Sequence, residues 1–492
     1  MKTRLTQNIL LAFSLCLFMS FNLIAGESVG RLTVQQAQQE IDLIEEVYER
    51  VHPGYTRYAT ESEMRAAWQQ LREQINNQQG IDVNDFYLAI QRVLVLIHCD
   101  HTKANIPAAL LEQRKTTGVF LPFRWHWVEQ RGFITQVSAS ATEQLNIGDE
   151  ILTIDGRPLT DLVEEVIQYI PYDGNTEWTR NAGVAQSLEF NGGAVDHFGS
   201  MLWQNKPEVT LRVRDKDANV RSLTVARINY DEYRKIPIVA AGARNFKDAI
   251  RFEIIDANTA YLAVDTFVNY RQPVDPEAVY TPVFAQIKQT GIKKLIVDLR
   301  KNGGGSNDAS QGLMRFLLTE EKVLYNDMYM KTLDMDGIRP YLSSWDERVL
   351  DPYRIAFSKR DEQHYSLRAF LTDDLDTVEP HELAFDGQLI ALTSESNSSG
   401  SAMLLTHLSE QDNATLVGQK TGGSSTGPTA GVLITLTLPH SNITTRVPVF
   451  RYQINAADHG FGLGVNPDIE VAVTAENWLE NVDASMAAAL AL

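Results

Sequence analysis

The sequence predicts a multidomain α/β protein, α+β overall, in which a helical module, a β-rich domain and a C-terminal α/β domain follow one another. Its 492 residues exceed the length that a single hydrophobic core usually organises. Apolar residues recur at helical spacing up to Ile97, alternating strands follow Gly118, and continuous apolar strands separated by helical patterns follow Phe252. With 44% hydrophobic and 22% charged residues, the composition is that of a folded globular protein.

Residues 1–25 are predicted to be a secretory signal peptide. Lys2 and Arg4 precede a long apolar run, and Ala25-Gly26 offers small residues for cleavage. A lipid-modified Cys16 is the weaker alternative, because the small residues expected before such a cysteine are missing. No later apolar stretch has the roughly 20 residues that span a bilayer. We therefore expect an exported protein, periplasmic or secreted, with no membrane span after signal removal.

Charge and cysteine content exclude nucleic acid as a partner and an intramolecular disulfide. The formal net charge is −19, and loss of Lys2 and Arg4 with the signal peptide makes it about −21. Nucleic acid is therefore excluded as a partner, because binding to phosphates needs basic patches. Cys99 is the one cysteine after residue 25, which excludes an intramolecular disulfide.

The region 31–115 is predicted to be an N-terminal helical module. Its apolar residues follow the helical period, with breaks at His52-Pro53-Gly54 and at Gln78-Gln79-Gly80. The module ends in a loop rich in polar side chains, Leu96-Ile-His-Cys-Asp-His-Thr102.

The β-rich region 116–230 contains a strand closed by an Asp-Gly turn. Its sequence, Asn146-Ile-Gly-Asp-Glu-Ile-Leu-Thr-Ile-Asp-Gly156, resembles the corresponding segment of a PDZ domain. That resemblance implies a cleft for a peptide terminus, although the carboxylate-binding loop expected near Gly118-Val-Phe-Leu-Pro-Phe123 matches poorly. A polar insert, about 172–204, interrupts the domain, and its position favours a role in covering the cleft and regulating entry.

The region 231–492 carries the segment on which the functional prediction depends. A buried strand, a small polar loop and a helix follow one another from Leu389 to Leu408, and Ser399 falls where the helix starts. Free backbone N–H groups and the positive end of the helix dipole would stabilise an oxyanion there. A serine at this position is by itself more often a helix cap than a nucleophile.

The surroundings of Ser399 resemble the signature of C-terminal-processing (tail-specific) serine peptidases. The resemblance rests on Ser399-Gly400-Ser401, on Leu416-Val-Gly-Gln-Lys-Thr-Gly-Gly423 and on Val297-Asp-Leu-Arg-Lys-Asn-Gly-Gly-Gly305. It implies a ClpP/crotonase-like α/β catalytic domain with Ser399, rather than Ser398 or Ser401, as the nucleophile. It also implies an oxyanion hole made by the N–H groups of Gly304 and Gly400.

The base is expected to be a histidine. The bacterial tail-specific branch uses a lysine where this chain has Ser424, and Lys420 lies elsewhere on the turn. The chain is more similar to the branch of the tricorn core protease and the protease-like activity factor, which implies His101 as the base, with His98 as the runner-up. We expect Asp100 to shape the loop.

The third member of the triad is expected to be Asp458, from the spacing that this branch implies after Ser399. The glutamate of the family is absent, so His459 or a water remains an alternative. Together these residues predict hydrolysis of protein or peptide substrates through an acyl-enzyme, without a cofactor or a metal.

Three other interpretations are weaker. A metal site in the loop 98–101 lacks the helical His-Glu-x-x-His pattern and a distant partner cluster. A Cys99 nucleophile lies close to the proposed base in sequence, and neighbouring side chains in an extended loop diverge. No serine lies in the G-x-S-x-G elbow, a strand-to-helix turn, of an α/β-hydrolase. The main alternative is a non-catalytic binding protein for apolar ligands or peptides on the same fold, similar to the interphotoreceptor retinoid-binding protein.

Overall fold

The structure is a computed structural model that describes residues 30–187, 189–203, 206–238 and 242–492. The predicted signal peptide, residues 1–25, lies outside these ranges. Within them, no helix combines the length and apolarity needed to cross a membrane.

Four helices dominate the N-terminal region, as the periodicity predicts. They are α1 (Val34–Val51), α2 (Glu61–Asn77), α3 (Val83–Val95) and α4 (Ala108–Thr116), and a short pair β1 (Arg31–Leu32) with β2 (Ile81–Asp82) joins their ends. Thr33 and Thr60 begin the first two helices with capping boxes, in which side chain and backbone satisfy each other's free groups. The predicted breaks at 52–54 and 78–80 separate the helices.

The second region is an antiparallel sheet in the order β4-β5-β6-β8-β9, with β7 beside β6. Its strands are β4 (Phe123–Val128), β5 (Arg131–Val137), β6 (Glu150–Ile154), β7 (Arg157–Pro158), β8 (Glu208–Arg214) and β9 (Val220–Ala226). Helix α5 (Leu159–Ile167) packs on β5 and β6. Between α5 and β8 come the short helices η1 (Glu177–Asn181), α6 (Ala182–Ala185), α7 (Ala194–His197) and α8 (Gly199–Leu202), and α9 (Tyr230–Tyr233) follows β9.

The C-terminal α/β region is built on a six-stranded sheet that is parallel except for its first strand. The order is β10 (Ile250–Ile254), β11 (Thr259–Val264), β12 (Lys294–Asp298), β19 (Gln388–Thr393), β20 (Ala414–Gly418) and β23 (Ile469–Glu470). Helices α10 (Pro276–Thr290), α11 (Asn307–Leu317) and α12 (Ser399–Leu408) pack in sequence beside it. Helix α14 (Ala484–Ala491) packs on the other face, against Ile390, Leu392 and Val417.

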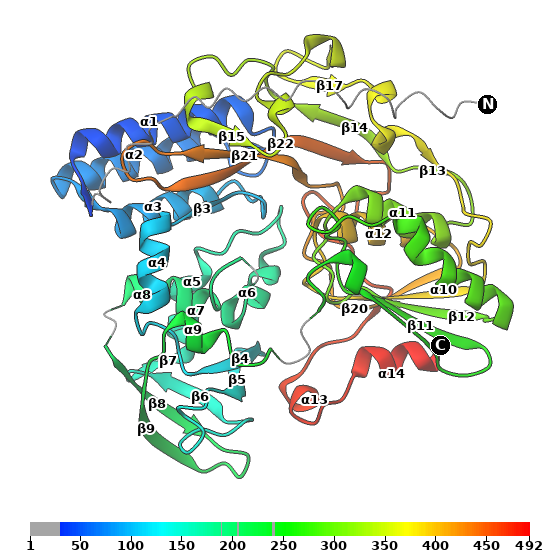
Figure 1. Cartoon of the computed structure of the whole chain (residues 1–492), viewed down its shortest axis with the longest axis horizontal. Coiled ribbons are helices and arrows are strands. Elements are labelled where there is room, and N and C mark those ends of the chain that lie inside the picture. The colour runs from blue at the N-terminus through cyan, green and yellow to red at the C-terminus, as the bar shows by residue number, and fades with distance from the viewer. Residues whose placement is uncertain (1–29, 188, 204–205, 239–241) are drawn as a thin grey trace, which may run out of the picture.

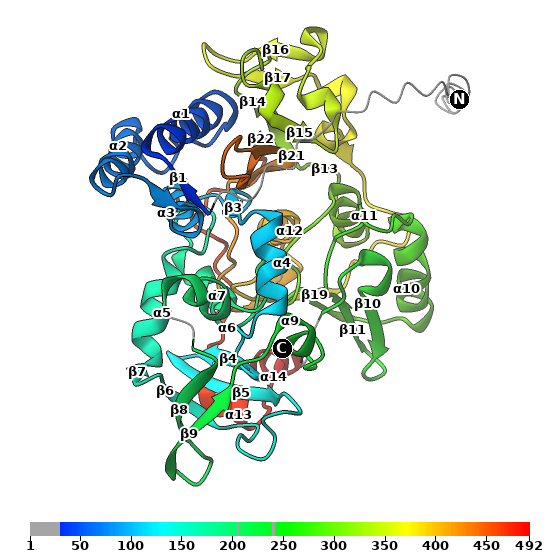
Figure 2. The same cartoon turned by 60° about the vertical axis from the view of Figure 1, so that its left-hand side comes forward.

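A second sheet spans the top of the molecule and joins the first region to the last (Figures 1 and 2). It contains β15 (Leu342–Ser344), β21 (Thr429–Thr437), β22 (Thr444–Ile454), β14 (Tyr325–Met330), β17 (Tyr365–Leu367) and β16 (Phe357–Lys359). Residues 96–102, which contain His98 and His101, form a loop that is called the histidine loop below. Strand β3 (Lys103–Asn105) directly follows this loop and pairs antiparallel with residues 444–446 of β22. The helical module therefore shares a sheet with the C-terminal region.

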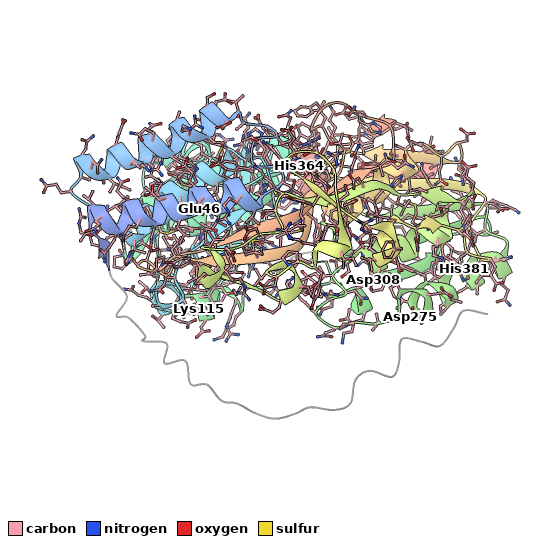
Figure 3. The ribbon with its side chains drawn as sticks, turned by 90° about the horizontal axis from the view of Figure 1, so that it is seen from above. Glu46, Lys115, Asp275, Asp308, His364 and His381 are labelled. Atoms are coloured by element: carbon pink, nitrogen blue, oxygen red, sulfur yellow. The ribbon has the colours of Figure 1, made fainter. Side chains whose placement is uncertain are left out.

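The remaining elements connect these parts. They are η2 (Phe246–Asp248), β13 (Lys322–Val323) paired with β18 (Thr377–Val378), η3 (Arg339–Tyr341), η4 (Glu347–Val349), η5 (Arg354–Ala356), η6 (Ala369–Leu371), η7 (Asp373–Leu375) and α13 (Ala475–Leu479). Seen from above, Glu46 and Lys115 lie in the left half of the molecule, and Asp275, Asp308 and His381 lie in the right half (Figure 3).

Near the C-terminus, α13 reaches the β-rich region. Trp478 stacks on His126 and Phe133, and the N–H of Ala475 donates to Glu129 Oε2 at 2.9 Å. These contacts hold the β-rich sheet beside the α/β region.

His52 anchors the histidine loop from below. Its Nδ1 accepts the N–H of Gly54 at 3.0 Å, and its Nε2 lies 3.0 Å from Thr102 Oγ1. The ring is fully buried, and burial lowers its pKa to about 3, so the folded protein keeps it neutral.

We predict that His52 makes folding stability depend on pH. Between pH 6.5 and 3 this histidine is protonated in the unfolded chain but neutral in the folded protein. The free energy of unfolding therefore falls as pH falls, by up to about 1.4 kcal/mol per pH unit. Urea unfolding of the wild type and of His52→Gln at pH 7 and pH 5 measures this. The free energy of unfolding of the wild type, minus that of His52→Gln, should be about 2 kcal/mol smaller at pH 5 than at pH 7. An equal difference at both pH values would contradict the prediction.

Candidate active site

Ser399 opens helix α12 in a strained backbone conformation. Its φ is +48°, in the left-handed region that residues other than glycine rarely adopt, which costs roughly 1–3 kcal/mol. The side chain is half-buried, and its hydroxyl has no hydrogen bond among the described residues. Ser401, by contrast, is fully buried and donates to the carbonyl of Asn302 at 2.6 Å. The structure thus leaves the hydroxyl of Ser399 available at the helix start.

Asn397 holds the loop before Ser399 in place. Its side-chain NH₂ group donates to the backbone carbonyls of Leu299 and Asn302 at 2.6 and 3.1 Å, and its side-chain oxygen Oδ1 accepts the N–H of Ser394 at 2.7 Å. Because Asn397 is fully buried, these bonds clamp the serine loop onto the glycine-rich loop that follows β12.

The histidine loop reaches this point through Asp100. Oδ2 of Asp100 accepts the hydroxyl of Ser398, the neighbour of Ser399. Oδ1 of Asp100 lies 2.6 Å from Nδ1 of His101, which is an ion-pair distance, although the angles are not those of a hydrogen bond. A continuous chain of contacts therefore runs from Ser398 through Asp100 to His101.

Asp100 and His101 shift each other's pKa. Burial is the largest single effect on His101 and lowers its pKa, but the charge and polar contacts of Asp100 and Cys99 together outweigh it, so the pKa stands well above the ordinary value. Burial raises the pKa of Asp100, and the charge of His101 with the Ser398 bond more than reverses this effect. Asp100 is therefore ionised and stabilises the protonated form of His101.

Asp173, from the predicted insert, is a further buried acid beside this chain. It is 4% exposed, and its Oδ2 accepts the N–H of Ser424 at 3.0 Å. Burial, and then the charge of Asp100, raise its pKa to about 7. Asp173, which comes from the β-rich region, thus binds the turn at Ser424, the position where the tail-specific branch is expected to carry a lysine. Lys420 is exposed.

Asp458 makes no contact with His101 among the described residues, so the structure does not bring the predicted pair together. The side chain is exposed, and its Oδ1 accepts the N–H of Gly460 at 2.8 Å. The alternative His459 contacts Ser409 Oγ through Nε2 at 3.2 Å. The carboxylate at the ring of His101 belongs to Asp100, which we had expected only to shape the loop.

Gly304 also needs a correction. It lies where predicted, because a Cβ on it would stand 2.8 Å from Ser399 Cβ and 2.9 Å from the nitrogen of Gly400. Its N–H, however, donates to Asn302 Oδ1 at 2.8 Å and is not free for an oxyanion. The N–H groups of Gly305 and Gly400 have no acceptor among the described residues, and a Cβ on Gly400 would lie 3.9 Å from Gly305 N.

His98 and Cys99 have structural contacts. Nε2 of His98 lies 2.6 Å from Tyr172 OH, and the carbonyl of His98 accepts the N–H of Gly174 at 2.9 Å. Cys99 donates to the carbonyl of Thr429, and burial raises the pKa of its thiol, which disfavours the thiolate. Ligand atoms of Cys99, Asp100 and His101 lie within 4.8 Å of one another, but each is engaged in the contacts above.

The start of the insert lies over the loops that carry the site. Thr176 Oγ1 donates to the carbonyl of Gly422, Trp178 Nε1 to the carbonyl of Thr421, and the N–H of Asn175 to the carbonyl of Gly462. With the contacts of Tyr172 to His98 and of Asp173 to Ser424, these bonds tie the β-rich region to the histidine loop, to the turn after β20 and to the loop at Gly462.

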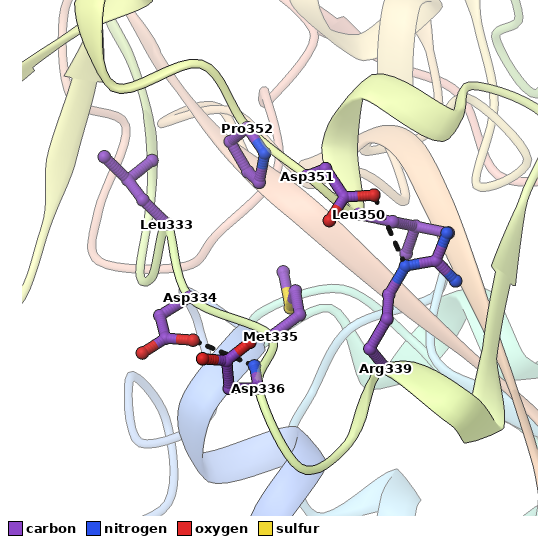
Figure 4. Close-up of a pocket in the computed structure, with 8 residues that line it drawn as sticks. All are labelled: Leu333, Asp334, Met335, Asp336, Arg339, Leu350, Asp351 and Pro352. Atoms are coloured by element: carbon purple, nitrogen blue, oxygen red, sulfur yellow. Dashed lines mark hydrogen bonds and ion pairs between the residues drawn. The ribbon is translucent and has the colours of Figure 1, made fainter.

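A separate hollow of about 250 Å³ lies in the 333–352 segment (Figure 4). Three aspartates and Arg339 line it, and Asp334 Oδ1 accepts the N–H of Asp336 at 2.8 Å. None of the residues around Ser399 contributes to it.

Comparisons with known proteins agree with this arrangement. Residues 117–236 match the PDZ domain family, and residues 258–471 match Peptidase family S41. No curated protein sequence matches the chain.

Solved structures share the fold. Mature CPAF complexed with lactacystin has a TM-score of 0.60 at 14% identity, covering 91% of this chain and 97% of that one. Mature CPAF has a TM-score of 0.59 at 14% identity, covering 91% and 94%.

Residues 117–236 thus form a PDZ domain, residues 258–471 form a catalytic domain of peptidase family S41, and the chain is a serine peptidase.

Proposed function

We propose that the chain is an exported peptidase that hydrolyses peptide bonds through an acyl-enzyme on Ser399, with His101 as the base. The observation that carries this proposal is the chain of contacts from Ser398 through Asp100 to His101, which ties the histidine loop to the residue beside Ser399. The strained backbone and unbonded hydroxyl of Ser399 support its assignment as the nucleophile.

In the proposed mechanism, His101 takes the proton of Ser399 as Oγ attacks the peptide carbonyl. Asp100 stabilises the imidazolium that forms. The N–H groups of Gly305 and Gly400 bind the oxyanion, and His101 then gives its proton to the leaving amine. Water hydrolyses the acyl-enzyme by the same steps. No hydrogen bond joins His101 to Ser399 among the described residues, and such bonds often tighten only when substrate binds.

The export part of the proposal rests on the sequence of residues 1–25, with its basic start and apolar run. Protein or peptide substrates follow from the peptidase family.

We predict that Ser399→Ala and His101→Ala each lower casein hydrolysis by about a thousandfold or more, because each removes a group on which bond cleavage depends. Ser396→Ala, at an exposed serine of the same loop, is the matched control and should keep full activity. A fluorophosphonate probe should label the wild type and not Ser399→Ala. If the wild type neither cleaves nor is labelled, the chain is instead a binding protein for apolar ligands or peptides.

The raised pKa of His101 predicts a distinctive pH profile. A base must be neutral to act, so kcat/KM should rise with pH through a pKa well above 6.5. Asp100→Asn removes the negative charge that favours the imidazolium, which should move this rise to lower pH and reduce the maximum rate. Asp458→Asn should leave both the pH of this rise and the maximum rate unchanged. A shifted pH profile in Asp458→Asn, with no shift in Asp100→Asn, would instead support Asp458 as the third member of the triad.

A further inference from the structure

Three successive N–H groups of the loop that precedes β4, those of residues 119–121, are in use. In PDZ domains a peptide adds to the sheet edge, and its terminal carboxylate is captured by a nest of backbone N–H groups. Here that loop is 118–121. The N–H of Val119 donates to the carbonyl of Thr117 at 2.9 Å, and that of Phe120 to the carbonyl of Ile228 at 3.1 Å. The N–H of Leu121 donates to Oδ1 of Asp196 at 3.0 Å.

Asp196 comes from the insert, on α7, and is 2% exposed. Its Oδ2 is buried without a hydrogen-bond partner among the described residues, and Nε of Arg227, which lines the same space, is also unpartnered. A buried carboxylate on a backbone N–H beside a guanidinium is the arrangement that a bound peptide terminus would have.

The space around Asp196 is otherwise filled. The hollow that Asp196 shares with Val119, Leu121, Trp203 and Arg227 measures about 10 Å³, which is close to the least volume that holds one water. Burial raises the pKa of Asp196 to about 6, while the Leu121 N–H and the charge of Arg227 oppose this. At neutral pH the group is therefore mainly ionised, as a peptide terminus is.

We propose that Asp196 occupies the carboxylate position of the PDZ domain, so that this peptidase does not select substrates by a free carboxyl terminus. The inference deepens the proposed function by naming internal peptide segments, rather than chain ends, as what the PDZ domain admits. It rests on the proposed function only in taking peptides as the ligands.

Binding to the full chain carrying Ser399→Ala tests this proposal without any cleavage. The probes are a free-acid peptide of about ten residues with an apolar end, and the same peptide amidated. We expect equal Kd values for the two forms. Adding Asp196→Ala should free the Leu121 N–H and Arg227, and the free acid should then bind about tenfold more tightly than the amide. Asp196→Asn retains an acceptor for Leu121 and should show no preference.

Formate gives a second measurement that does not depend on peptides. It should raise the Tm of Asp196→Ala by a few degrees relative to chloride, and leave the wild type unchanged, because it refills the vacated carboxylate position. A preference for the free acid with Asp196 intact would overturn the proposal. So would Asp196→Ala with neither a gain of free-acid binding nor a response to formate. Both readouts are independent of whether Ser399 cleaves peptides.

Discussion

The pairing of β3 with β22 is the constraint on which the rest of the site depends. It joins residues 103–105 to residues 444–446, more than 300 positions apart, and so fixes the end of the histidine loop to a strand of the C-terminal region. Tyr48 strengthens the junction, because its hydroxyl donates to the carbonyl of Arg446 at 2.9 Å. His101 is thereby positioned by the catalytic domain's own sheet, although it belongs to the helical module in sequence.

Buried and partly buried charges gather around this junction, and their mutual effects decide what the site can do. A carboxylate shielded from water is unfavourable unless it is paired, and the partly buried Asp100 is paired twice, with Ser398 and His101. Asp173 accepts a backbone N–H but has no cation at hydrogen-bond distance in the part of the chain that the structure describes, and its pKa is about 7. Two neighbouring acids are thus separated in pKa by their partners, so that one holds charge and the other titrates near physiological pH.

The sequence predicts those parts of the fold that follow from local pattern. The helix start at Ser399, the glycine turns and the Asp-Gly strand all combine a residue preference with a fixed backbone shape. The role of Asp100 could not be predicted, since neighbouring side chains meet only in a tight turn, such as the one closed by the N–H of Thr102 on the carbonyl of Cys99. Asp458 was assigned by spacing alone, and spacing does not determine the direction in which a loop side chain points. The N–H of Gly304 donates to Oδ1 of Asn302, two residues earlier, and the side chain of Asn302 is held in that direction by its bond to the carbonyl of Val264.

The position of α14 has a consequence for the strand that leads to Ser399. This helix packs on the face of the parallel sheet opposite to α12, so β19 is covered on both faces. Residues 389–392 of this strand are fully buried, and a strand buried on both faces is apolar along its whole length. The loop that carries Ser399 therefore starts from a strand that solvent reaches on neither side.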